Sequence, residues 1–256
     1  MYQSDLFKGK VALVTGGGSG IGFAITRQLL QLGASVIITS RKEERLVAAV
    51  EKLSEFGNCR YQVCDNREVE QVEALALNIK AAEGRLDILI NNAGGQFPSA
   101  VEDISFKGWN AVINNNLNAT FYVTQTMAKH FFIPNKEGSI VNIIANIFRG
   151  FPGMAHTGAA RAGIDNMTKT MAVEWSRYNI QINAVAPGII KSTGLEQYPP
   201  EFLADIESVI PAKRLGTVDE VAYLTLFLCS PMSRFITGET VYIDGGQRLW
   251  GDQFKL

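Results

Sequence analysis

The sequence lacks an excess of charge of either sign. Among its 256 residues, 24 are Lys or Arg and 25 are Asp or Glu, so the formal net charge is −1 at pH 7. Proteins bind a polyanion such as DNA, or an anionic membrane surface, through a broad basic field. We therefore expect no nucleic-acid partner, and a small molecule is the favoured ligand.

Cysteines and long apolar runs are also scarce. Cys59, Cys64 and Cys229 are odd in number, form no CxxC pair and lie in apolar stretches where a reduced thiol packs. The longest apolar run, VAYLTLFLC at 221–229, is too short to span a bilayer, and no signal peptide is evident. We expect a soluble protein in a reducing compartment, the cytoplasm, with no membrane partner and no metal.

The C-terminal tripeptide Phe-Lys-Leu differs from the peroxisomal address Ser-Lys-Leu because Phe replaces the small first residue. We interpret this similarity as chance.

Seven short apolar runs alternate with amphipathic stretches along the chain. Near-continuous apolar strands separated by helical segments are typical of a parallel sheet covered on both faces. The length and the 46% hydrophobic content suffice for one core. We expect a single α/β domain over residues 1–256, with a doubly wound seven-stranded parallel sheet flanked by helices. The expected strands are 10–16, 34–40, 60–65, 86–94, 138–144, 180–188 and 239–244.

The first helix and one long loop stand out between these strands. Ile21, Ile25, Leu29 and Leu32 recur at helical spacing, and Gly33 is placed to end the helix. The irregular stretch 188–213 is long for an α/β connection, which is typical of a substrate lid or wall. A disordered insertion is the alternative for that stretch.

A glycine-rich segment, TGGGSGIG at 15–22, follows the first expected strand and opens the first helix. Gly16, Gly20 and Gly22 permit a tight turn and a close approach of the backbone to a pyrophosphate, whose charge the helix N-terminus favours. A plain turn is the alternative, but the strand before and the helix after indicate a Rossmann-like dinucleotide site.

The second strand ends in TSRKEER, where an NAD site normally presents an acid to the ribose. No acid occupies Thr39 or Ser40, and Arg41 follows, so Ser40 and Arg41 are expected to bind a 2′-phosphate. NADP(H) is therefore the expected cofactor. The alternative is that residues 41–45 are only a solvated helix start. Asp65, after the third strand, accepts from the adenine amino group or caps the next helix.

Four motifs, taken in order, resemble the short-chain dehydrogenase/reductase family over essentially the whole chain. The motifs are TGGGSGIG, NNAGG at 91–95, NNNLNATF at 114–121 and NAVAPG at 183–188. The resemblance implies a seven-stranded doubly wound sheet, a homotetramer or homodimer, of which we expect the tetramer, and a catalytic Asn116 that holds a helix kink and a water. It also implies cofactor contacts at Ser19, Ile21, Asn92, Ala93, Gly94, Arg161, Pro187, Gly188, Ile190 and Ser192.

The family's catalytic Ser, Tyr and Lys are missing. Matched by motif, their positions hold Ile144, Thr157 and Arg161. In carbonyl reductases of the family the tyrosine protonates the nascent alkoxide, whereas a threonine hydroxyl is far too weak an acid near pH 7. Ordinary ketone reduction is therefore disfavoured.

Conjugate reduction of an enoyl thioester has other needs, because its enolate intermediate requires hydrogen-bond donors rather than a full proton. Thr157, a water held by Asn116 and a cofactor ribose hydroxyl are expected to donate. The segments NNAGGQF, GSIVNII, HTGAARAGIDNMTKT and IPAKRLG are also similar to the peroxisomal trans-2-enoyl-CoA reductase branch, with 2,4-dienoyl-CoA reductases as relatives. In that branch a Ser or Thr and an Arg occupy the same two positions.

Three further side chains were weighed as donors. Asp165 lies eight residues after Thr157, about 12 Å of helix rise, so both cannot serve one reacting carbon. We expect Asp165 to pair with Arg161 and Lys169 instead. Tyr198, in the loop, either reaches the site or packs under the prolines that follow it, and His156 is expected to be a packed or capping residue near the substrate pocket.

The sequence thus predicts an NADPH-dependent reductase of trans-2-enoyl-CoA, with an acyl-CoA thioester as its partner. Two alternatives remain open: a 2,4-dienoyl-CoA reductase, and a catalytically silent NADP(H)-binding protein.

Overall fold

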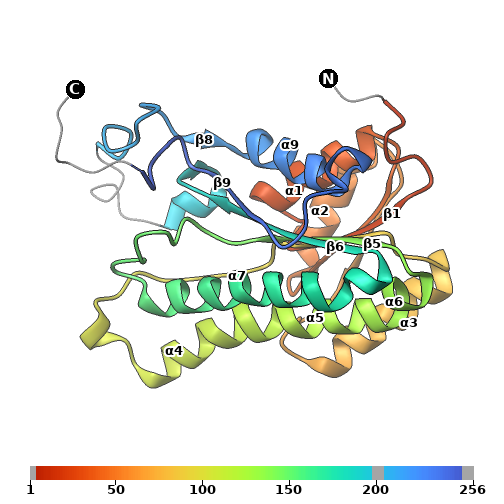
Figure 1. The fold of residues 1–256 in the computed structure, drawn as a ribbon, viewed down its shortest axis with the longest axis horizontal. Coiled ribbons are helices and arrows are strands. Elements are labelled where there is room, and N and C mark those ends of the chain that lie inside the picture. The colour runs from red at the N-terminus through yellow and green to blue at the C-terminus, as the bar shows by residue number, and fades with distance from the viewer. Residues whose placement is uncertain (1–3, 198–204, 250–256) are drawn as a thin grey trace.

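The computed structural model describes residues 4–197 and 205–249. Its centre is a parallel sheet of seven strands in the order β3-β2-β1-β4-β5-β6-β9 (Figure 1). Each predicted strand is present, and its ends differ from the predicted ones by at most three residues. The strands are β1 Val11–Thr15, β2 Ser35–Ser40, β3 Cys59–Val63, β4 Ile88–Asn91, β5 Gly138–Ile143, β6 Ile180–Pro187 and β9 Thr240–Ile243.

Helices cover both faces of the sheet, as a doubly wound fold requires. Figure 1 shows α1, α2 and α9 on one face and α3, α5 and α7 on the other. The α-helices are α1 Gly20–Gln31, α2 Glu43–Leu53, α3 Val69–Glu83, α4 Phe106–Ile113, α5 Ala119–Met127, α6 Ile133–Asn135, α7 Ala155–Trp175 and α9 Val218–Cys229. The expected end of the first helix is confirmed, since Gly33 follows it with φ of 90°.

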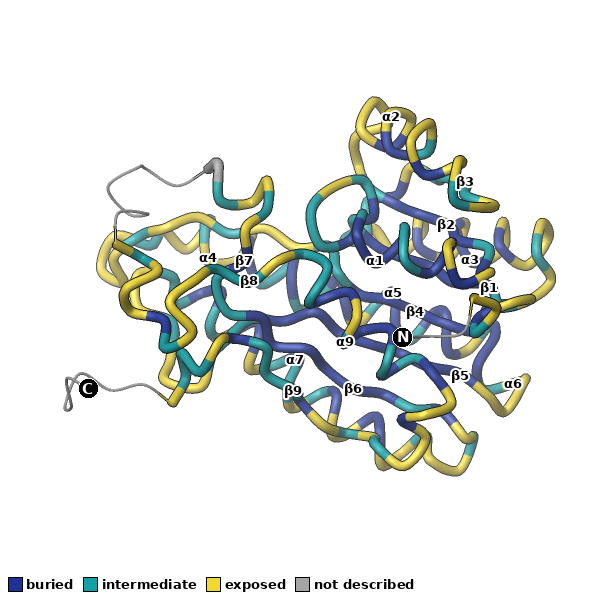
Figure 2. Tube along the Cα trace, turned by 90° about the horizontal axis from the view of Figure 1, so that it is seen from above, coloured by how far each residue is buried: buried dark blue, intermediate teal, exposed yellow. Residues whose placement is uncertain are grey.

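The sheet has a hydrophobic core on each of its two faces. Successive residues of a strand contribute to different cores, because their side chains point to opposite faces. In β1, Val14 packs with Leu29 and Leu226 under α1 and α9. Leu13 packs on the other face with Val123 and Phe131. Figure 2 shows the strands as a buried band between exposed loops. Full burial of each such side chain stabilises the fold by about 1.5–3 kcal/mol.

The stretch 188–213 is less irregular than predicted where the structure describes it. It contains the short strand β7 Ile190–Lys191, which pairs with β8 Gly216–Thr217, and the 3-10 turn η5 Thr193–Gln197. Tyr198 and its neighbours to 204 lie outside the described residues. Within the described residues, no helix is both long enough and apolar enough to cross a membrane.

Candidate functional site

The site lies where β1, β4, β5 and β6 end. From β1 the chain moves to β2 on one side and, after β3, returns to β4 on the other side. Open α/β sheets bind ligands at such a reversal, outside the carboxyl ends of the strands. The segments after β1, β4 and β5 meet here, and they contain the residues that the sequence singled out.

The glycine-rich turn after β1 is shaped by its own backbone. Gly16 and Gly20 have φ of 66° and 54°, which a side chain would strain. Any Cβ on Gly22 would collide with the carbonyl oxygen of Gly16 and lie 2.5 Å from Nδ2 of Asn92. Because Gly22 lets α1 pack directly on this turn, the backbone N–H groups at the start of α1 converge at one place.

The start of α1 fits a pyrophosphate. Ser19 precedes the helix in an extended conformation, its side chain caps no N–H group, and the first turn contains no acid. The helix dipole and these N–H groups favour an anion. Ser192 and Thr193 reach the same turn, since a Cβ on Gly20 would lie within 3.8 Å of both. Ser19, Gly20, Ile21 and Ser192 are thus grouped around one anion-binding turn.

Asn92 and Ala93 support the turn from β4. Both backbone N–H groups donate to Oγ1 of Thr15 at 3.0 Å, and Nδ2 of Asn92 donates to the carbonyl oxygens of Thr15 and Gly16 at 3.0 and 3.2 Å. The backbone N–H and Nδ2 of Asn92 are therefore used within the protein, and the side-chain amide fixes the turn. Sequence reasoning missed Thr15, although it ends β1 immediately before the glycines.

The segment after β2 presents Ser40 and Arg41 beside Asp65. Arg41 is exposed, and it forms no ion pair with another described residue. Asp65 accepts from the Arg67 guanidinium at 2.8 and 2.5 Å, and this side-chain hydrogen bond holds its pKa below the usual range. Asp65 does not cap α3, which begins at Val69, so that alternative for Asp65 is wrong.

Asn116 lies in a π-helical turn, η2 Asn114–Asn118, between α4 and α5. Its Nδ2 donates to the carbonyl oxygens of Gly95 and Val112 at 2.8 and 2.9 Å, and its Oδ1 accepts from the Gly95 N–H at 3.3 Å. The turn is wide enough for these contacts because π-helical bonding adds one residue. Asn116 therefore fixes the segment after β4 against the helix.

Arg161 faces the same segment from α7, and a Cβ on Gly94 would collide with its Nη2. Nη1 donates to the Ile143 carbonyl oxygen at 3.0 Å, while the buried Nε has no partner. Burial lowers the Arg161 pKa to about 10, so the group stays charged at pH 7. No carboxylate of the described residues pairs with it. A buried cation without a counter-ion favours a ligand rich in acceptors.

Thr157 lies one turn before Arg161 on α7 and is fully buried. Its N–H donates to Nδ1 of His156 at 2.8 Å, and its Oγ1 lies 3.2 Å from the same nitrogen. His156 is also buried, packs edge-on against Phe97, and has its pKa lowered by burial. The Thr157 hydroxyl therefore points to His156 in this structure.

Asp165 faces away from Arg161. It accepts from Oγ1 of Thr240 and from Lys169, each at 2.6 Å. The predicted pair with Lys169 is confirmed, whereas the pair with Arg161 is wrong. Both have the i,i+4 spacing, but the Arg161 guanidinium is turned under the sheet toward Ile143.

A cavity of about 670 Å³ opens beside these residues. Its lining includes the predicted Arg161, Ile21, Pro187, Gly188, Ile190 and Ser192, and also Ile144. Gln96, Asn146, Arg149 and Arg248 line it as well and were not predicted. These four residues lie in segments that follow strands, and ligands of open α/β sheets bind outside the carboxyl ends of the strands. That rule could have identified the segments, but not the individual residues. In the described ranges, no cluster of three or more His, Cys, Asp or Glu side chains is placed to hold a metal.

Known proteins match this chain over nearly its whole length. Residues 16–248 match the family model described as enoyl-(acyl carrier protein) reductase. A probable 2,4-dienoyl-CoA reductase of Bacillus subtilis is 38% identical over 94% of this chain and 97% of its own. The 3-oxoacyl-(acyl-carrier-protein) reductase FabG of Thermotoga maritima is also 38% identical, over 93% of this chain and 98% of its own.

A solved structure gives the same result for the fold. The chain superimposes on a short-chain dehydrogenase from Bacillus anthracis with a TM-score of 0.89 and 39% identity. The match covers 97% of this chain and all of the other.

Proposed function

The chain belongs to the short-chain dehydrogenase/reductase family of oxidoreductases, and from that premise we propose that it reduces the α,β double bond of trans-2-enoyl-CoA thioesters with NADPH. The observation that supports this proposal is the pair Thr157 and Arg161. They lie one helical turn apart on α7, at the positions of the family's proton-donating tyrosine and its lysine.

The chemistry of this pair favours conjugate reduction over ketone reduction. Ketone reduction leaves an alkoxide that needs a proton at once, and neither a threonine hydroxyl nor a guanidinium is an adequate acid near pH 7. Conjugate reduction leaves an enolate, which hydrogen bonds and a nearby positive charge stabilise. The bound reduced nicotinamide supplies the hydride to the β-carbon.

Each residue then has a separate role. Arg161 places a permanent charge at the cavity wall, with one carbonyl partner for its donors, where it would hold the nicotinamide ribose and the thioester oxygen. Asn116 fixes Gly95, the residue before Gln96, which lines the cavity. Thr157 is fully buried and is not among the residues that line the cavity, so it donates to the enolate oxygen only after its hydroxyl turns away from His156. Solvent water protonates the α-carbon.

NADPH is proposed over NADH because of Arg41. Its guanidinium is exposed at the end of β2, where it is available for charge-assisted hydrogen bonds to a 2′-phosphate. Arg67 neutralises the nearby Asp65, so no uncompensated acid repels that phosphate.

A 2,4-dienoyl-CoA substrate is the second candidate. The Bacillus subtilis relative is named as a probable enzyme of that activity. The same donors would stabilise a dienolate, since its oxygen occupies the same place and only the conjugation is longer.

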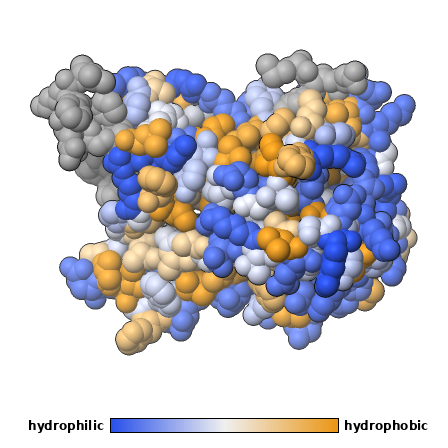
Figure 3. All heavy atoms as spheres, viewed as in Figure 1, coloured by the Kyte–Doolittle hydropathy of each residue, from blue (hydrophilic) through white to orange (hydrophobic). Residues whose placement is uncertain are grey.

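We also propose a cytoplasmic homotetramer. Helices of the lower layer in Figure 1 expose apolar side chains, among them Trp109, Phe121 and Val173. On the face drawn in Figure 3, apolar and charged side chains are interspersed, including over these helices. Exposed aromatic side chains of this kind are enriched at subunit interfaces. The three cysteines are free thiols, which agrees with a reducing compartment.

The proposal is tested by supplying the purified protein with NADPH and a panel of thioesters. Crotonyl- to dodecenoyl-CoA, a 2,4-dienoyl-CoA and a 3-ketoacyl-CoA are compared by loss of absorbance of the reduced cofactor. We expect enoyl-CoA to be reduced at least about 100-fold faster than ketoacyl-CoA, a barrier difference of about 2.7 kcal/mol. Faster ketoacyl reduction would overturn the proposal, and NADPH binding without turnover would favour a silent binding protein.

A further inference from the structure

The cavity beside the active site is lined by cations and, among the described residues, by no carboxylate. Arg149, Arg161 and Arg248 contribute to the lining, and the other lining residues are uncharged. The whole chain has a net charge of −1, so this is a local concentration of positive charge. A concave site lined by one sign of charge attracts a ligand of the opposite sign.

Two of these arginines follow strands other than the one that leads into the pyrophosphate turn. The pyrophosphate turn follows β1, whereas Arg149 follows β5 and Arg248 follows β9. Four strand intervals separate β1 from β9, about 19 Å at 4.8 Å per interval. Two strand intervals separate β1 from β5, about 10 Å, so Arg149 and Arg248 both extend from segments other than the pyrophosphate turn.

Arg248 is held in place by its neighbours. Its guanidinium lies 4.6 Å from the centre of the Tyr242 ring, and Nη1 lies 3.4 Å from Oδ1 of Asp244. The buried Asp244 also accepts from the Arg248 N–H and from Nδ2 of Asn146, at 2.8 and 3.1 Å. These contacts fix one cation at the cavity wall and tie the end of β9 to the segment after β5.

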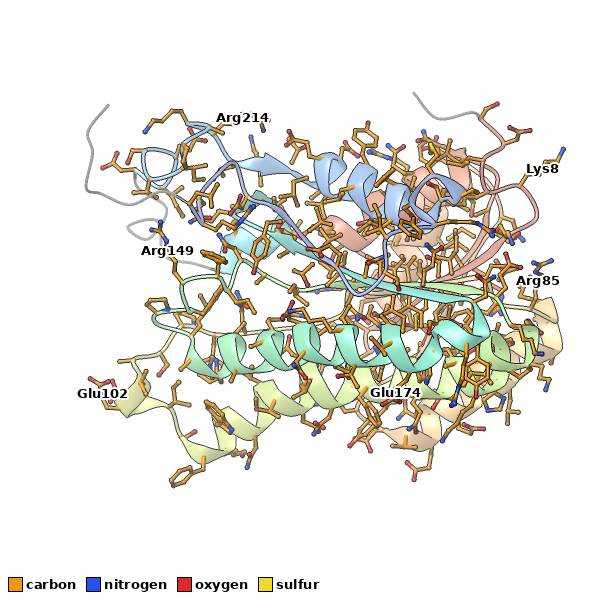
Figure 4. The ribbon with its side chains drawn as sticks, viewed as in Figure 1. Lys8, Arg85, Glu102, Arg149, Glu174 and Arg214 are labelled. Atoms are coloured by element: carbon orange, nitrogen blue, oxygen red, sulfur yellow. The ribbon has the colours of Figure 1, made fainter. Side chains whose placement is uncertain are left out.

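Arg149 is exposed and forms no ion pair with another residue of the described chain. Figure 4 shows it on the segment between β5 and α7, at the end of the molecule where the strands end. Its charge is thus not neutralised by the protein, although it lines the cavity. A flexible cation of this kind contributes mainly when a ligand supplies the anion.

We propose that Arg149 and Arg248 form a subsite for an anionic group of the substrate, a phosphate or a carboxylate, remote from the reacting double bond. This inference rests on the proposed function. The enoyl thioester group itself is uncharged, so the anion belongs to one of the two ends of the molecule. It is either a phosphate of the coenzyme A carrier or a carboxylate at the far end of the acyl chain.

The test uses three thioesters and three variants of the full-length protein. Crotonyl-CoA has phosphates, crotonyl-N-acetylcysteamine has no charge, and the N-acetylcysteamine thioester of an ω-carboxylated enoic acid has only a carboxylate. Arg149→Gln removes the charge and Arg149→Lys retains it. Arg234→Gln is the matched control, because Arg234 is an exposed arginine near Glu137, beside the opposite end of β5. The KM and the calorimetric Kd of each thioester with the NADP⁺ complex are measured.

The expected result is a rise of about 5–10-fold in KM and Kd for an anionic thioester with Arg149→Gln, with kcat within twofold. Arg149→Lys and Arg234→Gln stay within twofold of the unmodified protein. An effect on crotonyl-CoA assigns the anion to the carrier, and an effect on the carboxylated thioester assigns it to the acyl chain. If the KM and Kd of each thioester are the same in every variant as in the unmodified protein, the proposed subsite is wrong.

The uncharged thioester separates this result from failure of the proposed function. Turnover of crotonyl-N-acetylcysteamine tests the reaction without the subsite. If no thioester is reduced, the proposed reaction is wrong. The calorimetric Kd of crotonyl-CoA and of the carboxylated thioester still decides the subsite in that case.

Discussion

The two halves of the sheet's carboxyl edge differ in how their polar groups are used. After β1 and β4, Asn92 and Ala93 donate to Thr15 and Gly16, so the cofactor turn is fixed by bonds within the protein. After β5, Arg161 has one carbonyl partner and a buried unpartnered Nε, and Arg149 has no ion pair among the described residues. The Thr15–Gly16 turn is internally satisfied, whereas the segments after β5 retain unpaired charge.

This difference separates two tasks of the site. A cofactor turn needs a constant shape, and internal hydrogen bonds give it one at no cost in charge. A site that stabilises an enolate needs positive charge that is already in place, because preorganised charge costs no reorganisation during the reaction. The folded protein tolerates the unpaired Arg161 at the expense of stability.

The largest effect is expected from Arg161→Met, which removes the buried charge from the second half. Turnover of enoyl-CoA should fall about 10²–10³-fold, the usual range for loss of one oxyanion-stabilising donor. The free energy of unfolding should rise by about 1–3 kcal/mol, because methionine fills the site without a buried charge. Chemical denaturation and steady-state kinetics measure the two changes.

Lys169→Met on the same helix is the control for Arg161→Met, since Lys169 is 55% exposed. Lys169→Met should change the turnover of enoyl-CoA and the free energy of unfolding only slightly. Loss of stability in Arg161→Met, with turnover retained, would show that Arg161 is a structural residue.

Gly22→Ala should distort the glycine-rich turn after β1 and weaken cofactor binding. Its Cβ would collide with the Gly16 carbonyl and approach Asn92, so the turn must open. We expect the Kd for NADPH to rise about 100-fold, measured by fluorescence titration. Gly18→Ala is the matched control, because the nearest atom to a Cβ there is 3.4 Å away. Equal affinities of the two variants would contradict the packing described for this turn.

Arg41→Asp should have a smaller effect, confined to the choice of cofactor. The added carboxylate repels a 2′-phosphate and accepts from a ribose hydroxyl. NADPH affinity should fall about 10–30-fold while NADH affinity rises. Arg45→Asp, at an exposed position inside α2, should change both affinities little. If the unmodified protein binds NADPH and NADH with equal affinity, the proposed preference for NADPH through Arg41 is wrong.

The smallest effect is expected from Asp165→Asn. Asp165 bonds to Thr240 and Lys169 and is turned away from Arg161. Turnover should stay within about threefold of that of the unmodified protein. Loss of the ion pair with Lys169 at this partly exposed position should lower the free energy of unfolding by less than about 1 kcal/mol. A loss beyond 100-fold, with cofactor binding intact, would move the proton donor to this residue.

The sequence predicted which segments form strands better than it predicted where each strand ends. The expected strand 86–94 stops as β4 at Asn91, because Asn92 and Ala93 turn to Thr15 instead of continuing the ladder. Periodicity and apolar runs locate a strand, but tertiary hydrogen bonds decide where it ends.

Side-chain partners were the least predictable part of the site. Spacing placed Arg161, Thr157 and Asp165 on α7, and it allowed Arg161 to pair with Asp165. The packing of α7 on the sheet turns Arg161 toward Ile143, and a helical repeat does not contain that information. Arg149 was missed because a lone charge in a loop has no periodic signal, and only the cavity reveals its position.

The central claim is that hydride goes to the β-carbon of an enoyl thioester. Crotonyl-CoA is reduced with NADPH deuterated at the transferred position, and the butyryl-CoA product is examined by NMR. The account predicts one deuterium at the β-carbon and a solvent-derived proton at the α-carbon. Deuterium at the α-carbon, or label found only on the carbinol carbon of a ketoacyl-CoA supplied in parallel, would contradict it.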